Sequence, residues 1–127
     1  MIDHVSVEVS DLAASGSFYD AVFAPLGFVR IAEWPARIGF GKRYPEFWIN
    51  LRRECAGVGP DTGNHVCLRA PSREAVIAFH DAAITAGGRS DGTPADRQAT
   101  VTTYFGAFVR DLDGNKIEAV TFPREAE

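Results

Sequence analysis

The chain has 127 residues, of which 46% are hydrophobic and 24% charged, a balance typical of one globular domain with a hydrophobic core. A formal net charge of −4 and a pI near 5.3 exclude the strongly basic proteins that bind nucleic acid or anionic membranes. No apolar run approaches the roughly 18 residues of a membrane span, and the cysteines do not form a disulfide framework. We therefore expect a single cytoplasmic domain, residues 1–127, without nucleic-acid or membrane partners.

The first half of the chain predicts a strand, a helix and three more strands. Hydrophobic alternation in residues 4–9 is typical of a strand, and Ser10 with Asp11 offers an N-cap for the helix that follows. This helix is expected to end at Gly27, just after a proline. Three short runs of apolar and aromatic residues then predict strands, at residues 28–34, 37–41 and 46–51. A polar, glycine-rich linker occupies residues 53–63.

After the linker the same order of elements begins again. Residues 65–70 are typical of a strand, and Ser72 starts a helix that is expected to end near Gly87. Two further strands are clear, at residues 104–111 and 115–122. The stretch before them, residues 89–102, is polar and poor in apolar residues. It predicts a loop, either a mobile lid over a site or an ordinary surface connection.

The two halves also match residue by residue. When residues 4–28 are shifted by 61 positions, seven of the 25 aligned residues are identical, whereas average composition would give roughly two. The pair His4 and His65 is among these identities, and shared helix propensity does not explain it. We therefore predict an α+β fold of two tandem βαβββ modules, at about residues 1–52 and 64–122.

Glu118 lies inside the apolar last strand, where a carboxylate is costly unless a cation neutralises it. Side chains alternate along strands, so His4 and His65 occupy matching positions on the first strand of each module. Two imidazoles and one carboxylate form a ligand set for a divalent ion, with positions left open for water or substrate. The alternatives are that Glu118 points outward and pairs with Lys116 or Arg110, and that the histidines are solvated or loop residues.

Together these motifs resemble the vicinal oxygen chelate superfamily, which includes glyoxalase I, extradiol dioxygenases, methylmalonyl-CoA epimerase, fosfomycin-resistance transferases and bleomycin-binding proteins. The resemblance rests on the stretches "DHVSVEVSDLAASGSFYDAVFAPLGF", "GNHVCLRA" and "AFVRDLDGNKIEAV", and it covers nearly the whole chain. It implies that each module curls into a half-barrel and that two modules enclose a cup-shaped site. It also implies a homodimer, in which His4 of one chain would join His65 and Glu118 of the other.

The resemblance assigns His4, His65 and Glu118 as ligands of a divalent metal. Fe, Mn, Ni, Co and Zn all suit such ligands, so the sequence does not select among them. Glyoxalase I carries a further carboxylate where this chain has Trp48, which weakens a methylglyoxal activity. Glu46, two residues earlier on the same strand face, is the nearest substitute.

Other members of the superfamily match less completely. Extradiol dioxygenases need a further histidine and a tyrosine near the iron. Tyr104 could approach the site, but His80 falls on the second helix, so ring cleavage is disfavoured. Fosfomycin-resistance enzymes have a threonine where Ser6 stands, and Arg69 and Arg110 are the candidates for binding a phosphonate. Bleomycin-binding members lack the metal ligands that this chain retains.

Strand alternation directs a further set of side chains toward the same cup as candidate substrate-binding residues: Ser6, Trp48, Asn50, Cys67, Arg69 and Phe108. The favoured hypothesis is a metal-dependent isomerase, lyase or transferase that acts on a small oxygen-chelating molecule. In it the metal stabilises an oxyanion, and Glu46 or Tyr104 moves a proton. The alternatives are a non-catalytic binding protein of the bleomycin-resistance type and a structural module with remnant ligands.

Overall fold

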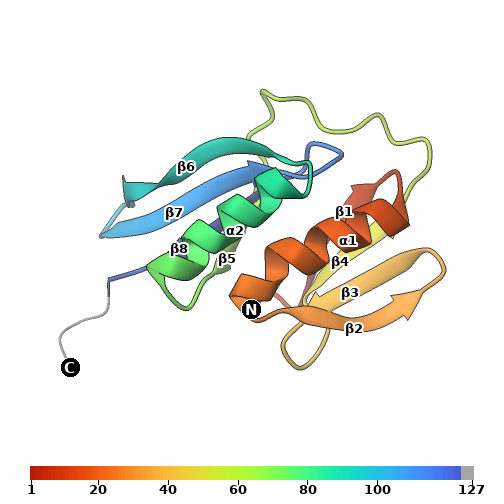
Figure 1. Ribbon diagram of the computed structural model, residues 1–127, viewed down its shortest axis with the longest axis horizontal. Helices are drawn as coiled ribbons and strands as arrows, with labels where there is room; N and C mark the ends of the chain where they lie inside the picture. The colour runs from red at the N-terminus through yellow and green to blue at the C-terminus, as the bar shows by residue number, and fades with distance from the viewer. Residues whose placement is uncertain (124–127) are drawn as a thin grey trace.

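The computed structural model describes residues 1–123 and contains two four-stranded sheets, each with one helix packed on it (Figure 1). The first module comprises β1 (Val5–Val9), α1 (Leu12–Phe23), the short 3-10 helix η1 (Ala24–Leu26), β2 (Val29–Trp34), β3 (Arg37–Gly41) and β4 (Phe47–Leu51). The second comprises β5 (His65–Arg69), α2 (Arg73–Thr85), β6 (Arg89–Gln98), β7 (Thr103–Arg110) and β8 (Lys116–Thr121). Neither long helix in this part of the chain has the length and hydrophobicity of a membrane span. The end of the predicted domain, residues 124–127, lies outside the described part.

Each module follows the same path through its sheet. The strand orders are β1-β4-β3-β2 and β5-β8-β7-β6, with the first and last strands of each module parallel and the other pairs antiparallel. The registers also match, because Ser6 pairs with Trp48 in the first module and Cys67 pairs with Glu118 in the second. The predicted α+β fold of two tandem βαβββ modules is confirmed. In the described residues both sheets remain open and do not close into a barrel.

The helix ends follow the local chemistry of the sequence. The Asp11 carboxylate accepts the backbone N–H of Ala14 at 3.0 Å, and the Ser72 hydroxyl accepts that of Ala75 at 3.1 Å. Each side chain therefore satisfies a free donor in the first turn of its helix. After η1 the chain turns at Gly27, whose φ of 80° is a left-handed conformation that glycine adopts without strain.

Aromatic side chains build the core between the helices and the inner faces of the sheets. On α1, Tyr19 and Phe23 pack against Phe40 of β3 and Phe47 of β4, with ring centres 4.9–6.1 Å apart. All four are fully buried, and burying each phenylalanine stabilises the fold by roughly 1.5–3 kcal/mol. The two long helices contact each other and lie side by side over the same side of the two sheets (Figure 1). The other face of each sheet carries no helix in the described residues.

The loop between β7 and β8 ties the two modules together. The Tyr19 hydroxyl on α1 donates a buried hydrogen bond of 2.6 Å to Oδ2 of Asp111 in this loop. Oδ1 of Asp111 accepts the backbone N–H groups of Asp113 and Asn115, at 2.9 and 2.8 Å. The Asn115 side-chain amide donates to the carbonyl oxygen of Glu8 on β1, at 2.8 Å. The Asp-Leu-Asp-Gly-Asn segment is therefore a clamp between the modules as well as a turn.

Arg110 holds the linker against the second sheet. Its side chain is 4% exposed and donates to the Asp91 carboxylate at 2.9 Å. It also donates to the backbone carbonyl oxygens of Pro60 and Thr62 in the linker, both at 3.0 Å. The predicted alternatives, in which Arg110 pairs with Glu118 or binds a phosphonate, are wrong because its donors are occupied by these partners.

The prediction of a loop at residues 89–102 is wrong for most of this stretch. Arg89–Gln98 form β6, which pairs with β7 as the outer strand of the second sheet. The register shifts between Ser90 and Gly92, and again between Gly92 and Ala95, which accommodates a glycine and a proline in the strand. A polar edge strand lacks the alternation of a half-buried one, so its extended form depends on its pairing partner.

Replacing Tyr19 by phenylalanine removes the hydroxyl that links α1 to Asp111 and keeps the buried ring. We expect Tyr19→Phe to lower the free energy of unfolding by about 1–3 kcal/mol, because the Asp111 carboxylate loses a buried donor. Urea denaturation followed by circular dichroism measures this difference. Tyr44→Phe, at an exposed tyrosine, is the matched control. Unchanged stability in Tyr19→Phe would contradict the clamp.

Candidate functional site

Two of the predicted metal ligands lie on the face of the second sheet opposite α2. His65 and Cys67 come from β5, Glu118 from β8, and Tyr104 and Phe108 from β7. The register places Glu118 between Cys67 on one side and Phe108 on the other. Side chains alternate across each strand, so these residues share this face while the residues between them belong to the core.

The Glu118 carboxylate is buried and only partly satisfied. The side chain is 5% exposed, and its Oε1 lies 3.2 Å from Nε2 of His65. The other oxygen, Oε2, is buried and has no hydrogen-bond partner among the described residues. A buried ionised oxygen without a donor or a cation is costly. A positive charge beside Glu118 would therefore stabilise this carboxylate.

The His65 ring is oriented by the backbone just before β5. Its Nδ1 lies 3.0 Å from the carbonyl oxygen of Gly63. A carbonyl only accepts, so Nδ1 carries a proton, and in the neutral form of the ring Nε2 presents a lone pair to Glu118. Two acceptors in contact need a shared proton or a bound cation, and a histidine held through its other nitrogen is the common form of a metal ligand. An imidazole nitrogen with a carboxylate oxygen fits a divalent transition metal.

The groups next to Glu118 are held in their protonated forms. Burial, with the Glu118 carboxylate as the next contribution, raises the pKa of the Cys67 thiol to about 12. Burial also raises the pKa of the Tyr104 phenol, and the same carboxylate adds to the shift. Both groups are therefore neutral at neutral pH. Cys67 is therefore not a thiolate at neutral pH, and Tyr104 keeps its phenolic proton.

His4 stands apart from the other two predicted ligands. Its side chain is 52% exposed, and its Nδ1 lies 2.7 Å from the Asp3 carboxylate. In the described part of a single chain, no three histidine, cysteine or acidic side chains lie close enough to hold a metal ion. The structure therefore brings His65 and Glu118 together without His4, and the complete triad stays a prediction. His80, the remaining histidine, is buried on α2 and takes no part in this face.

The predicted catalytic and substrate-binding residues divide between the two sheets. The first sheet and the turn before β4 carry Ser6, Glu46, Trp48 and Asn50, and the second sheet carries Cys67, Arg69, Tyr104 and Phe108. Ser6 and His65 both line a hollow of about 360 Å³ where β1 and β5 approach each other. Arg69 is exposed, and its guanidinium lies 4.9 Å from the centre of the Phe122 ring.

Sequence reasoning missed cationic side chains that lie against the aromatic residues of these faces. On the second sheet, the Arg97 guanidinium is 5.1 Å from the centre of the Phe108 ring. On the first sheet, Arg37 lies near the rings of both Trp34 and Trp48. The sequence could have revealed the contact between Arg37 and Trp34. These two residues flank a two-residue turn between strands, and residues in such positions pair directly. Arg97 falls in the expected loop, so alternation could not assign it to a face.

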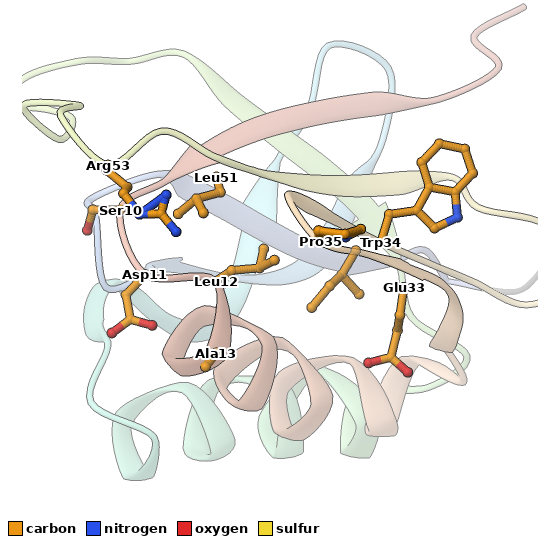
Figure 2. A pocket seen from close by; sticks show the side chains of 10 residues that line it. Ser10, Asp11, Leu12, Ala13, Glu33, Trp34, Pro35, Leu51 and Arg53 are labelled. Atoms are coloured by element: carbon orange, nitrogen blue, oxygen red, sulfur yellow. The ribbon is translucent and has the colours of Figure 1, made fainter.

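A hollow of about 660 Å³ lies on the helix side of the first sheet, between the start of α1, the β2–β3 turn and the end of β4 (Figure 2). Leu12 and Leu51 supply apolar lining, and Asp11 and Glu33 supply acidic side chains. The Trp34 ring extends away from the hollow (Figure 2). None of the predicted site residues lines it, so the candidate site lies elsewhere, on the opposite faces of the sheets.

Family comparison agrees with the fold and with these motifs. The family model described as "Glyoxalase/Bleomycin resistance protein/Dioxygenase superfamily" matches residues 1–119. The chain belongs to this superfamily. Members of the glyoxalase/bleomycin resistance/dioxygenase superfamily generally use divalent metals. In this member, the contact between His65 and Glu118 is the place whose chemistry fits such an ion.

Solved structures of superfamily members match nearly the whole chain. A glyoxalase/bleomycin resistance protein from Albidiferax ferrireducens T118 is 35% identical with a TM-score of 0.79, and the match covers 95% of this chain and 98% of that one. A glyoxalase/bleomycin resistance protein/dioxygenase family enzyme from Burkholderia phytofirmans PsJN is 20% identical with a TM-score of 0.72, covering 96% and 98%. No protein of curated function matches significantly. The resemblance inferred from the sequence motifs is confirmed at the level of the superfamily.

In the metal-free protein, the buried Glu118 carboxylate should destabilise the fold. We expect Glu118→Gln to raise the free energy of unfolding of chelator-treated protein by about 1–3 kcal/mol, because an amide offers a donor to Nε2 of His65 and removes a buried charge. Urea denaturation measures the change, and Glu54→Gln, at an exposed linker position, is the matched control. A less stable Glu118→Gln variant would show that Glu118 is satisfied without a cation.

Proposed function

We propose that this superfamily member is a divalent-metal-dependent enzyme that acts on a small oxygen-chelating organic substrate. The observation that carries the proposal is the 3.2 Å contact between Nε2 of His65 and Oε1 of Glu118, with Oε2 of Glu118 buried and unpartnered. A divalent ion beside these atoms would neutralise the carboxylate and turn two opposed acceptors into two ligands. Fe, Mn, Ni, Co and Zn are the candidate metals, since all accept nitrogen and oxygen ligands.

The third ligand in this proposal is His4, supplied by a second copy of the chain in a homodimer. The Asp3 carboxylate lies 2.7 Å from Nδ1 of His4, much as the carbonyl oxygen of Gly63 lies next to Nδ1 of His65. In each case the hydrogen bond orients the ring and leaves Nε2 for a metal, which is the usual role of an outer partner. His4 does not reach Glu118 within the described part of one chain, and a twofold-related copy is the simplest source of the missing ligand.

When bound, the metal would polarise a substrate oxygen as a Lewis acid. The protein groups around it have distinct tasks. Tyr104 lies beside Glu118 and is suited to donate a hydrogen bond or proton to the substrate, and Glu46 is the candidate base. Phe108 and Cys67 flank Glu118 on the neighbouring strands and form the border of the site. This set supports isomerase, lyase or transferase chemistry.

The first sheet favours a second candidate function, a non-catalytic small-molecule binding protein of the bleomycin-resistance type. Trp48 stands at the position that matches Glu118 of the second module, so this half of the proposed cup offers an aromatic ring in place of a carboxylate. Trp34 lies beside it, with ring centres 6.2 Å apart. Aromatic walls bind flat organic molecules without any chemical step. This function requires ligand binding that survives removal of metal.

Elemental analysis of tag-free protein, purified without chelator, tests the metal site. We expect about one ion per chain in the parent protein, and less than about a tenth of that in His65→Ala and in Glu118→Ala, because each variant removes a ligand. Glu54→Ala, in the exposed linker, is the control and should retain the ion. A folded parent protein that takes up none of the candidate metals would reject the metalloenzyme and favour the binding protein.

Mixing two defective variants tests whether the site is shared between chains. His4→Ala and Glu118→Ala each break both sites of a symmetric dimer, but a dimer of one with the other keeps one intact site. Refolding equal amounts together should restore about a quarter of the parent metal content, since about half of the dimers are mixed. Sedimentation velocity verifies that dimers form. A metal content that stays at the level of the single variants would reject a site shared through His4.

A further inference from the structure

The first sheet holds an arginine between the two tryptophans of the chain. The Arg37 guanidinium carbon lies 4.0 Å from the centre of the Trp34 ring and 5.0 Å from the centre of the Trp48 ring. The two rings are 6.2 Å apart and inclined at 58°. Because the rings are this close and inclined, Arg37 lies in a V-shaped notch rather than a flat sandwich. One side of the guanidinium therefore stays open.

A glycine makes room for this notch. Gly39 pairs with Trp48 across β3 and β4. A Cβ at position 39 would lie 3.0 Å from two atoms of the Trp48 ring and 2.7 Å from Cβ of Pro45. In the second module the residue opposite Glu118 is Phe108, so the position equivalent to Gly39 carries a large side chain. The absence of a side chain at Gly39 is what lets the Trp48 ring lie down over β3.

Arg37 has no acidic partner within ion-pair distance in the described residues, although acidic side chains are close in the fold. Glu33 on β2 is bound to Arg30 at 2.7 Å, on the helix side of the sheet. Glu8 lies two strands away and is 4.0 Å from Arg52. The positive charge of Arg37 is thus covered by two indole rings but not neutralised, a cation–π arrangement with its hydrogen-bond donors still free for a ligand.

We propose that this notch binds the carboxylate of a small organic ligand with a flat apolar body. A guanidinium presents its N–H groups as a rigid fork that fits a carboxylate through two parallel hydrogen bonds. The indole rings on either side favour a flat body over a bulky one. Asn50, which pairs with Arg37, and Ser6, which pairs with Trp48, bring further polar side chains to the same face.

This inference deepens the proposed function by naming the chemical class of the substrate, and in that respect it rests on the proposed function. The binding step itself uses side chains of the first module alone and needs no metal. An experiment can therefore reject the carboxylate site without rejecting the metal site, and the reverse.

Benzoate is a suitable probe, and the chain reports its binding directly because Trp34 and Trp48 are its two tryptophans. We expect saturable changes in tryptophan fluorescence when chelator-treated protein is titrated with benzoate, and much weaker binding of the uncharged benzamide. Arg37→Gln should weaken benzoate binding by about tenfold or more. Arg37→Lys should also weaken it, since lysine keeps the charge but lacks the fork. Arg43→Gln, at another exposed arginine of the first module, should bind as the parent does.

Two further variants separate the notch from the metal site. Gly39→Ala should shift the tryptophan emission and weaken benzoate binding, because the added methyl group displaces the Trp48 ring while Arg37 is retained. Glu118→Ala should lose the metal but bind benzoate like the parent. Circular dichroism verifies that each variant is folded. Equal affinity for benzoate and benzamide, or parent-like benzoate binding by Arg37→Gln, would overturn the proposal.

Discussion

The buried hydrogen bond between Tyr19 and Asp111 is the constraint on which the arrangement of the two modules depends. The Tyr19 ring belongs to the aromatic core of the first module, and its hydroxyl reaches the loop that starts β8 of the second. Burial raises the pKa of Asp111, while hydrogen bonds from Tyr19 and Asn115 oppose that shift and favour the ionised form. The loop is held on both sides, so the start of β8 and the position of Glu118 are set relative to the first module.

The two modules share one backbone register, but the sheet faces away from the helices carry side chains of opposite charge. In the second module, the strand position that faces the free side holds Glu118, a buried carboxylate that calls for a cation. In the first module the equivalent position holds Trp48, whose ring lies over Gly39. The same ring lies against the cationic side chain of Arg37, which an anion would neutralise. A duplicated scaffold permits this divergence, because the sheet pairing is made by backbone groups and the exposed faces are free to change. In the functions proposed above, a metal on the second module and an anionic ligand group on the first would be complementary occupants of these faces.

Several features of the fold and of the site could be predicted because they depend on patterns within short stretches of the sequence. The repeat at a spacing of 61 residues and the alternation in β1 and β5 were sufficient for the order of most elements. The resemblance to the superfamily rested on longer motif stretches, which include the Asp-Gly-Asn turn before β8. The cost of a carboxylate in an apolar strand was sufficient to single out Glu118. The edge strand β6 could not be found in this way, since its polar residues are extended only because β7 pairs with them. Arg110 likewise has the sequence context of a surface residue and becomes buried only when the linker folds over it.

By itself, the sequence determined the order of the modules, the ends of the helices and the presence of a carboxylate in the apolar last strand. These follow from periodicity, capping and composition over short distances along the chain. Only the tertiary structure decided that His65 meets Glu118 while His4 stays apart from both. It also decided that Arg37 enters a notch between two indole rings. The physical reason is that such contacts join residues from different strands, and their distances depend on sheet packing and on the space that small residues leave, which no local pattern specifies.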